Sequence, residues 1–159
     1  MKSHSRYAKK LNRKRVLICL VIFFALLPVF SYLHEAGHAL VCIADGNEAE
    51  ISVDAFSGGT TLCHGDVSNQ FAYKISGGLL AGIVGTAAGI ALFRWKIPFI
   101  VITTIGIGHL INAGIEAFAD SYFTYGVEWS FFMGLVEFVI FLTLLIIFDR
   151  KMVKRNDFL

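Results

Sequence analysis

The sequence predicts an all-α integral membrane protein of about four transmembrane helices, with a short outer loop that has the pattern of a β-hairpin. Of its 159 residues, 56% are hydrophobic and only 16% are charged. The mean hydropathy is +0.67, far above the usual range of soluble proteins. The apolar residues gather in runs long enough to cross a hydrocarbon core, at 16–44, 75–93, 97–118 and 129–148.

Positive charge predicts the orientation of these runs. Of 14 Lys and Arg residues, seven precede the first run, two lie between the second and third, four follow the fourth, and Lys74 alone falls on the other side. Because cytoplasmic segments carry the excess of Lys and Arg, both termini are expected in the cytoplasm, and 45–74 and 119–128 outside. The chain then divides into a basic cytoplasmic N-terminus (1–15), a single transmembrane domain (16–148) and a basic cytoplasmic C-terminal tail (149–159).

The basic N-terminus could also suggest nucleic acid as a partner. Charges directly before an apolar run are more economically a topology signal with affinity for anionic lipid. We therefore expect the lipid bilayer as a partner, and no nucleic acid.

The first run, 16–44, carries an H-E-x-x-H motif at its polar end. His34 and His38 are spaced i, i+4, so on a helix both imidazoles project from one face and can reach one zinc ion. Glu35 lies beside that ion, where a carboxylate can take a proton from an attacking water. Counted from residue 16, the histidines lie about 27 to 33 Å along the helix, toward the outer side of the bilayer. A coincidental pair of histidines is the alternative, but ionisable groups in an apolar run are costly and indicate function.

The outer loop that follows has the alternation of a β-hairpin. Ile51, Val53 and Ala55 alternate with polar residues, Ser57-Gly58-Gly59 favours a turn, and 60–63 can return as a second strand. Such a hairpin could hold an extended substrate by main-chain pairing. It could equally be a loop that covers the site.

The three cysteines, Cys19, Cys42 and Cys63, are odd in number and lack C-x-x-C spacing. The sequence therefore predicts neither a disulfide framework nor a zinc cage. Cys19 is expected to be buried in the first run, and Cys42, one turn after His38, to be a small apolar filler that could also face the site. His64 could add a ligand, but a lone loop histidine is usually solvated.

The second run is rich in glycine, with Gly78/Gly82 and Gly85/Gly89 forming G-x-x-x-G pairs. Such pairs permit close contact between helices. Packing within the chain is the more economical use, and homo-oligomerisation through this run is the other.

The third run carries a continuous polar face on an otherwise apolar helix. His109, Asn112, Glu116 and Asp120 fall at i, i+3, i+7 and i+11, so this face must meet protein or water. Counted from residue 97, Glu116 and Asp120 lie about 28 and 34 Å along, at the depth of the motif histidines, whereas His109 lies only about 18 Å along.

The fourth run contains Glu137 near its middle, another costly group that could pair with His109 or line a water path. Tyr122, Tyr125 and Trp129 fit an aromatic belt at the outer membrane interface.

Together, residues 30 to 122 resemble the site-2 protease family of intramembrane zinc metalloproteases. The resemblance rests on the motif at the end of a transmembrane helix, a hairpin-like Gly-Gly segment, Gly77-Gly78 in a glycine-rich span, and Asn112 with Asp120 eight residues later. It implies His34, His38 and Asp120 as zinc ligands, Glu35 as general base, and Asn112 as a group that assists substrate or oxyanion binding.

The chain departs from the family pattern in two places. Asp120 is followed by Ser121, where the family has glycine, and no proline follows Asn112. Glu116 therefore remains an alternative third ligand, since a carboxylate from either residue suits a catalytic zinc.

The resemblance implies that 16–148 is a transmembrane metalloprotease domain, a zinc-dependent metalloendopeptidase expected to hydrolyse a peptide bond in or near a transmembrane segment of a membrane-protein substrate. One alternative is a non-proteolytic membrane relative with a binding or regulatory role. Another is a small metal or proton transporter that uses His109, Glu116 and Glu137.

Overall fold

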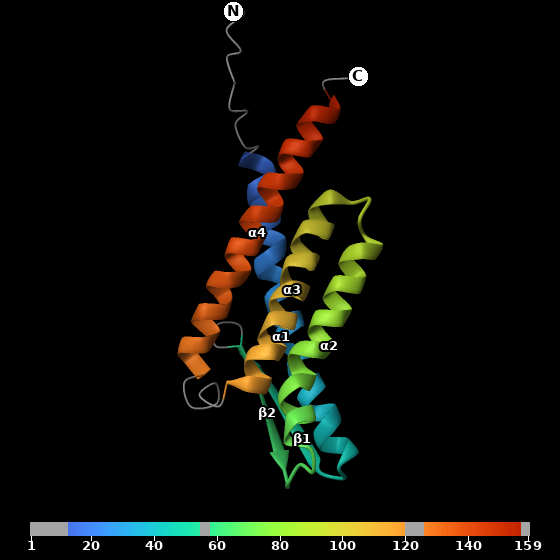
Figure 1. The fold of residues 1–159 in the computed structure, drawn as a ribbon, viewed down its shortest axis with the longest axis vertical. Helices are drawn as coiled ribbons and strands as arrows, with labels where there is room; N and C mark the ends of the chain where they lie inside the picture. The colour runs from blue at the N-terminus through green and yellow to red at the C-terminus, as the bar shows by residue number, and fades with distance from the viewer. Residues whose placement is uncertain (1–12, 55–57, 120–125, 157–159) are drawn as a thin grey trace, which may run out of the picture.

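The computed structural model describes residues 13–54, 58–119 and 126–156 (Figure 1). Over these residues the chain forms helices and one antiparallel hairpin, in the order α1 (Arg13–Ala44), β1 (Glu48–Asp54), β2 (Gly58–His64), α2 (Gln70–Ala91), α3 (Lys96–Phe118) and α4 (Gly126–Asn156). The predicted helices and the predicted hairpin are confirmed.

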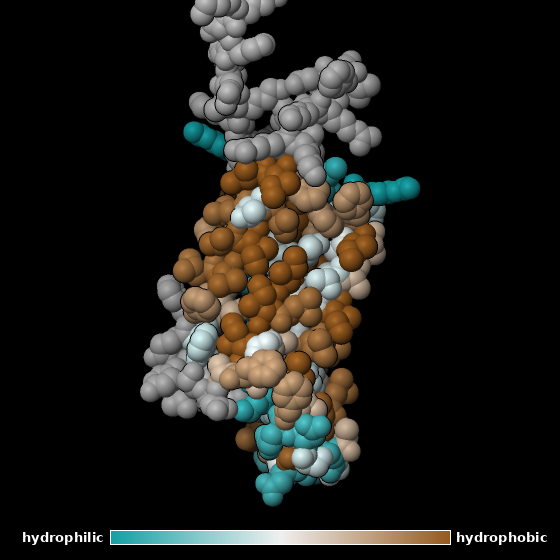
Figure 2. All heavy atoms as spheres, in the orientation of Figure 1, coloured by the Kyte–Doolittle hydropathy of each residue, from teal (hydrophilic) through white to brown (hydrophobic). Residues whose placement is uncertain are grey.

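Three of the described helices, α1, α2 and α3, are long and apolar enough to cross a membrane. Figure 2 shows hydrophobic residues over the helical body on this face, with hydrophilic residues gathered at the hairpin end and at the opposite end. The structure is thus compatible with the predicted membrane protein. In the described part of α4 the apolar stretch is shorter, Phe132–Phe148, so a fourth span stays a prediction.

Small residues bring α2 and α3 into direct contact as antiparallel neighbours. A Cβ on Gly78 would lie 2.6 Å from the backbone of His109 and Ala113, and one on Gly85 would lie 2.7 Å from Cα of Gly106. Helices in lipid gain little from hydrophobic burial and associate through such close van der Waals packing. The G-x-x-x-G pairs are used within the chain, as predicted, and homo-oligomerisation remains a prediction.

A buried apolar cluster joins α1, α3 and α4 toward the ends of the helices remote from the hairpin. It includes Cys19 and Phe23 of α1, Ile100 of α3, and Phe141 and Leu145 of α4. Cys19 is fully buried and free, as the sequence predicts.

The hairpin pairs β1 with β2, with Ile51 opposite Thr61 and Ser52 opposite Thr60. Its second strand begins at Gly58, which has a positive φ of 90°, so Gly58 and Gly59 belong to the strand rather than to the predicted turn. The connecting residues 55–57 lie outside the described ranges.

Side-chain hydrogen bonds fasten the base of the hairpin. Asn47 Nδ2 donates to the carbonyl of Asp66 at 2.9 Å, and Asp45 accepts from the backbone N–H and the hydroxyl of Ser68, both at 2.8 Å. These contacts tie the end of α1 to the segment that enters α2.

A disulfide joins Cys42, near the end of α1, to Cys63 of β2, with the Cα atoms 5.9 Å apart. The prediction that the cysteines form no disulfide framework, with Cys42 as an apolar filler, is therefore wrong. The rule used there counts cysteines and their spacing along the chain. Here β2 folds back onto the last turns of α1 and brings two distant cysteines within bonding range.

Candidate metal centre

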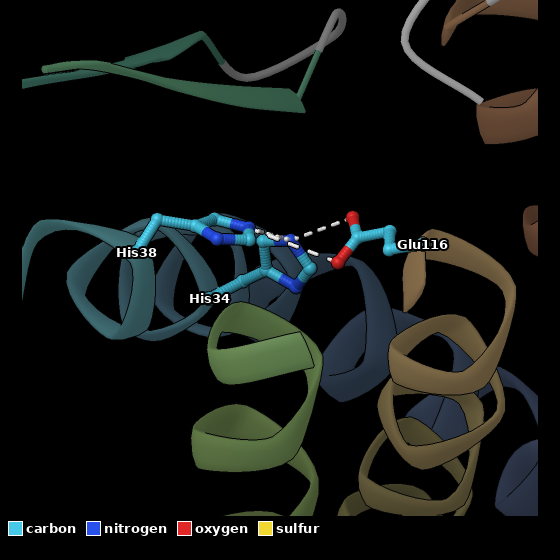
Figure 3. Close-up of side chains that lie close together, drawn as sticks. All are labelled: His34, His38 and Glu116. Atoms are coloured by element: carbon cyan, nitrogen blue, oxygen red, sulfur yellow. Dashed lines mark hydrogen bonds and ion pairs between the residues drawn. The ribbon is translucent and has the colours of Figure 1, made fainter. Parts of the chain in front are cut away.

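Two histidines and a carboxylate converge where α1 meets α3 (Figure 3). His34 Nε2 lies 3.1 Å from His38 Nε2 and 3.1 Å from Glu116 Oε1, and His38 Nε2 lies 3.7 Å from Glu116 Oε2. All three residues are buried, with 6%, 6% and 2% of their surface exposed. One helical turn separates the histidines, and α3 supplies the carboxylate from the opposite side.

The outer nitrogen of His38 is held by α2. His38 Nδ1 lies 2.7 Å from the carbonyl oxygen of Tyr73, which can only accept, so Nδ1 carries the proton. The lone pair of neutral His38 is then on Nε2, directed toward Glu116. Histidines that bind metals commonly donate their other N–H to a backbone carbonyl in this way.

The outer nitrogen of His34 meets His109 of α3, with the two Nδ1 atoms 3.3 Å apart. The depth estimate from sequence missed this contact, because it assumed that the first and third runs begin at the same level. Figure 1 shows that α1 begins farther from the hairpin than α3 does. His109 lies outside the three-residue cluster and contacts one of its members, His34.

Glu116 is oriented by its neighbour on the same helix. Asn112 Nδ2 donates to Glu116 Oε1 at 3.0 Å, and both residues are buried. The described part of the polar face predicted on the third run, His109, Asn112 and Glu116, therefore faces protein. The auxiliary role predicted for Asn112 toward substrate stays a prediction, and its observed contact is with the carboxylate.

The two candidate third ligands differ in what the structure describes. Glu116 lies against both motif histidines, whereas Asp120, which the family resemblance implies as the ligand, lies outside the described residues. The cluster observed is thus the one with the alternative ligand, Glu116.

Glu35, the predicted general base, is covered by β2. Thr61 Oγ1 lies 2.8 Å from Glu35 Oε2 and 2.9 Å from its backbone carbonyl oxygen. One hydroxyl proton serves only one of these acceptors at a time. A Cβ on Gly59 would lie 2.9 Å from Glu35 Oε1, and only 7% of Glu35 is exposed. The hairpin was predicted either to hold an extended substrate or to cover the site. The contacts observed in this state are those of a cover.

Gly77 of α2 leaves the space in which the imidazoles meet. A Cβ at this position would overlap His38 Nε2 and lie 2.8 Å from His34 Nε2. Any other residue here would occupy the side of the cluster on which the two ring nitrogens converge. Gly37 has a related role, since a Cβ there would lie 2.8 Å from Cα of Gly77.

Two further residues singled out in the sequence lie elsewhere. His64 is exposed, at the end of β2, and does not belong to the metal-ligand cluster found among the described residues. Glu137 of α4 packs its carboxyl group against Gly108 of α3. A pairing of Glu137 with His109 stays a prediction.

The donor set suits a metal ion. Ligands about 2.0–2.1 Å from one tetrahedral ion lie about 3.3 Å from each other, close to the separations between the two Nε2 atoms and the Glu116 oxygens. Two imidazole nitrogens and one carboxylate also match a catalytic zinc site, which keeps its fourth position open. The group of His34, His38 and Glu116 could therefore hold a metal ion.

Comparisons of the chain with protein-family models, with curated proteins and with solved structures find no match. The class of protein is thus set by the fold and the site: a helical chain with three helices able to span a membrane and a buried His-His-Glu group.

Proposed function

We propose that the protein is an intramembrane zinc metalloprotease that hydrolyses a peptide bond in or near a transmembrane segment of another membrane protein. One observation carries the proposal. The H-E-x-x-H histidines and a carboxylate from a distant helix converge in a buried group, with the motif glutamate next to His34 in the chain.

Zinc bound there would supply the Lewis acidity that activates water and polarises the scissile carbonyl. Glu35 takes the proton of the attacking water and returns it to the leaving amine nitrogen. Tyr73 and His109 hold the rings of His38 and His34 by their outer nitrogens, and Asn112 holds Glu116. The substrate binds as an extended peptide, since its amide must leave a helix before water can reach it.

The proposed topology has both termini in the cytoplasm, α4 as a fourth span, and the site toward the outer side. The distribution of Lys and Arg supports it. The Cys42–Cys63 disulfide supports it as well, because disulfides persist in oxidising compartments and are rare in the cytosol.

The test compares zinc content and cleavage of a membrane-embedded substrate for wild type and Glu35→Gln in liposomes. Wild type should hold about one zinc per chain, and Glu35→Gln should keep that zinc but lose cleavage, because the amide cannot accept the proton. The matched control is Glu50→Gln, the same chemical change at an exposed position of β1, which should cleave normally. Unimpaired cleavage by Glu35→Gln would contradict the proposed metalloprotease function.

A second candidate, a metal or proton transporter, is favoured by the contact of His109 with His34, which extends the polar groups beyond the cluster along α3. It predicts flux into liposomes that Glu137→Gln abolishes. The protease does not require Glu137, so cleavage that survives this substitution separates the two candidates.

A further inference from the structure

One face of β2 lies on α1. Side chains at alternate positions of a strand share a face, and Gly59, Thr61 and Cys63 are the less exposed residues of β2 while Thr60, Leu62 and His64 are exposed. Thr61 contacts Glu35, and Cys63 is bonded to Cys42, two helical turns further along α1. The same strand face therefore covers the predicted general base and carries the covalent link to the helix.

This arrangement keeps substrate from Glu35. Gly59 and Thr61 of β2 lie against the Glu35 carboxylate, and only 7% of Glu35 is exposed, so in the observed state β2 occupies the space that a peptide would need on this side. Cleavage then requires β2 to move away from α1, and the disulfide limits that movement because it lies only two residues from Thr61.

We propose that the Cys42–Cys63 disulfide is a redox modification site, that it takes a dithiol reductant, and that its reduction releases β2 from Glu35. The consequence for cleavage rests on the protease function proposed above. The oxidised protein is the closed form, and the reduced protein is the form that admits substrate.

Reduction proceeds by thiol–disulfide exchange in two steps. Cys63 is partly exposed and Cys42 is buried, so a reductant thiolate attacks the sulfur of Cys63, the S–S bond breaks, and Cys42 leaves as a thiolate that takes a proton. The second thiol of the reductant then attacks the mixed disulfide and releases Cys63 as a thiol. Two electrons and two protons pass to the protein, and the reductant becomes a disulfide.

The reduced hairpin stays attached at its base. The Cys42 sulfur lies 3.3 Å from the carbonyl oxygen of Glu48, so the new thiol has an acceptor in place. The bonds from Asn47 to Asp66 and from Ser68 to Asp45 do not involve the disulfide. Reduction therefore leaves two hydrogen bonds at Thr61, one from its hydroxyl to Glu35 and one from the Tyr73 hydroxyl to its carbonyl oxygen at 3.4 Å. Both are hydroxyl contacts that water can replace, so the hairpin opens as a lid without unfolding.

The experiment uses the whole chain in liposomes, either oxidised or reduced with dithiothreitol. The reductant is removed before zinc is loaded, because its thiols themselves bind zinc. Three quantities are measured: amide hydrogen exchange over 58–64, the rate of zinc release to a soluble chelator, and cleavage of a membrane-embedded substrate. Reductant should raise all three several-fold in wild type. Cys63→Ser should be fast without reductant and show no further response. Cys19→Ser, which removes the buried free cysteine, should respond like wild type.

Thr61→Val keeps the disulfide and guards against misfolding of the cysteine variant. It should show faster zinc release than wild type when oxidised and a further increase on reduction. The proposal is overturned if full reduction, verified by alkylation of both thiols, leaves exchange and zinc release unchanged, or if Cys63→Ser behaves like oxidised wild type. If hydrogen exchange and zinc release accelerate on reduction but neither form cleaves substrate, the redox-controlled lid is supported and the protease function is contradicted.

Discussion

The two sides of the candidate metal centre are built differently. On the helical side, α2 and α3 meet through glycines that allow backbone-to-backbone contact, and Gly77 lies against the imidazoles. On the hairpin side, β2 is held by the Thr61 hydroxyl, by the Tyr73 hydroxyl that donates to the Thr61 carbonyl, by a disulfide and by a few hydrogen bonds at the base. Helix backbones in direct contact cannot shift by a small amount without a clash. A hydroxyl group, in contrast, can exchange its hydrogen bond for one to water at little cost. On the proposed function, the helical side therefore sets the geometry of the metal ligands, and the hairpin side sets the access of substrate to them.

The largest effect should come from Gly77→Ala, on the rigid side. Its Cβ would overlap His38 Nε2, and the backbone that carries it is fixed by α2 packing. We expect loss of stoichiometric zinc, measured by metal analysis of the purified protein. Gly114→Ala is the matched control, because a Cβ there meets nothing within 4 Å. Normal zinc content in Gly77→Ala would remove the distinction between the two sides.

A smaller effect is expected from His109→Leu, which removes the partner of His34 Nδ1 and leaves the three candidate ligands in place. Loss of such an orienting partner typically weakens metal binding about 10- to 100-fold. Competition with a chelator of known affinity measures the change. His64→Leu, an exposed histidine outside the cluster, should bind zinc like wild type. Equal affinities for the two variants would mean that His109 only fills space.

The smallest effect should come from Asn47→Ala at the base of the hairpin. It removes the hydrogen bond to the Asp66 carbonyl, which is worth about 1 kcal/mol. Hydrogen exchange of β1 and β2 should rise while zinc affinity stays unchanged, because the hairpin supplies none of the three residues of the cluster. A large fall in zinc affinity would show that the hairpin also sets ligand geometry.

The sequence predicted the parts of the fold that follow from local pattern. Long apolar runs gave the helices, and alternation from Ile51 to Val53 with nearby glycines gave the hairpin. The i, i+4 spacing of His34 and His38 predicted their convergence, since one helix fixes both.

The rest depends on how distant segments are placed. The disulfide and the contact of Thr61 with Glu35 arise only when β2 folds onto α1. The contact of His109 with His34 depends on an offset between α1 and α3 that hydropathy does not report. The choice between Glu116 and Asp120 stayed open because their i, i+4 spacing predicts both on one helical face at similar depth. Helix spacing therefore identified the candidates, and tertiary structure brought Glu116 to the histidines.

The most direct test of the central claim, that His34, His38 and Glu116 hold the metal, is the zinc stoichiometry of Glu116→Ala beside that of Asp120→Ala. We expect Glu116→Ala to lose zinc, because its carboxylate lies 3.1 Å from His34 Nε2, and Asp120→Ala to keep about one zinc per chain. The reverse result, with zinc retained in Glu116→Ala and lost in Asp120→Ala, would contradict the account.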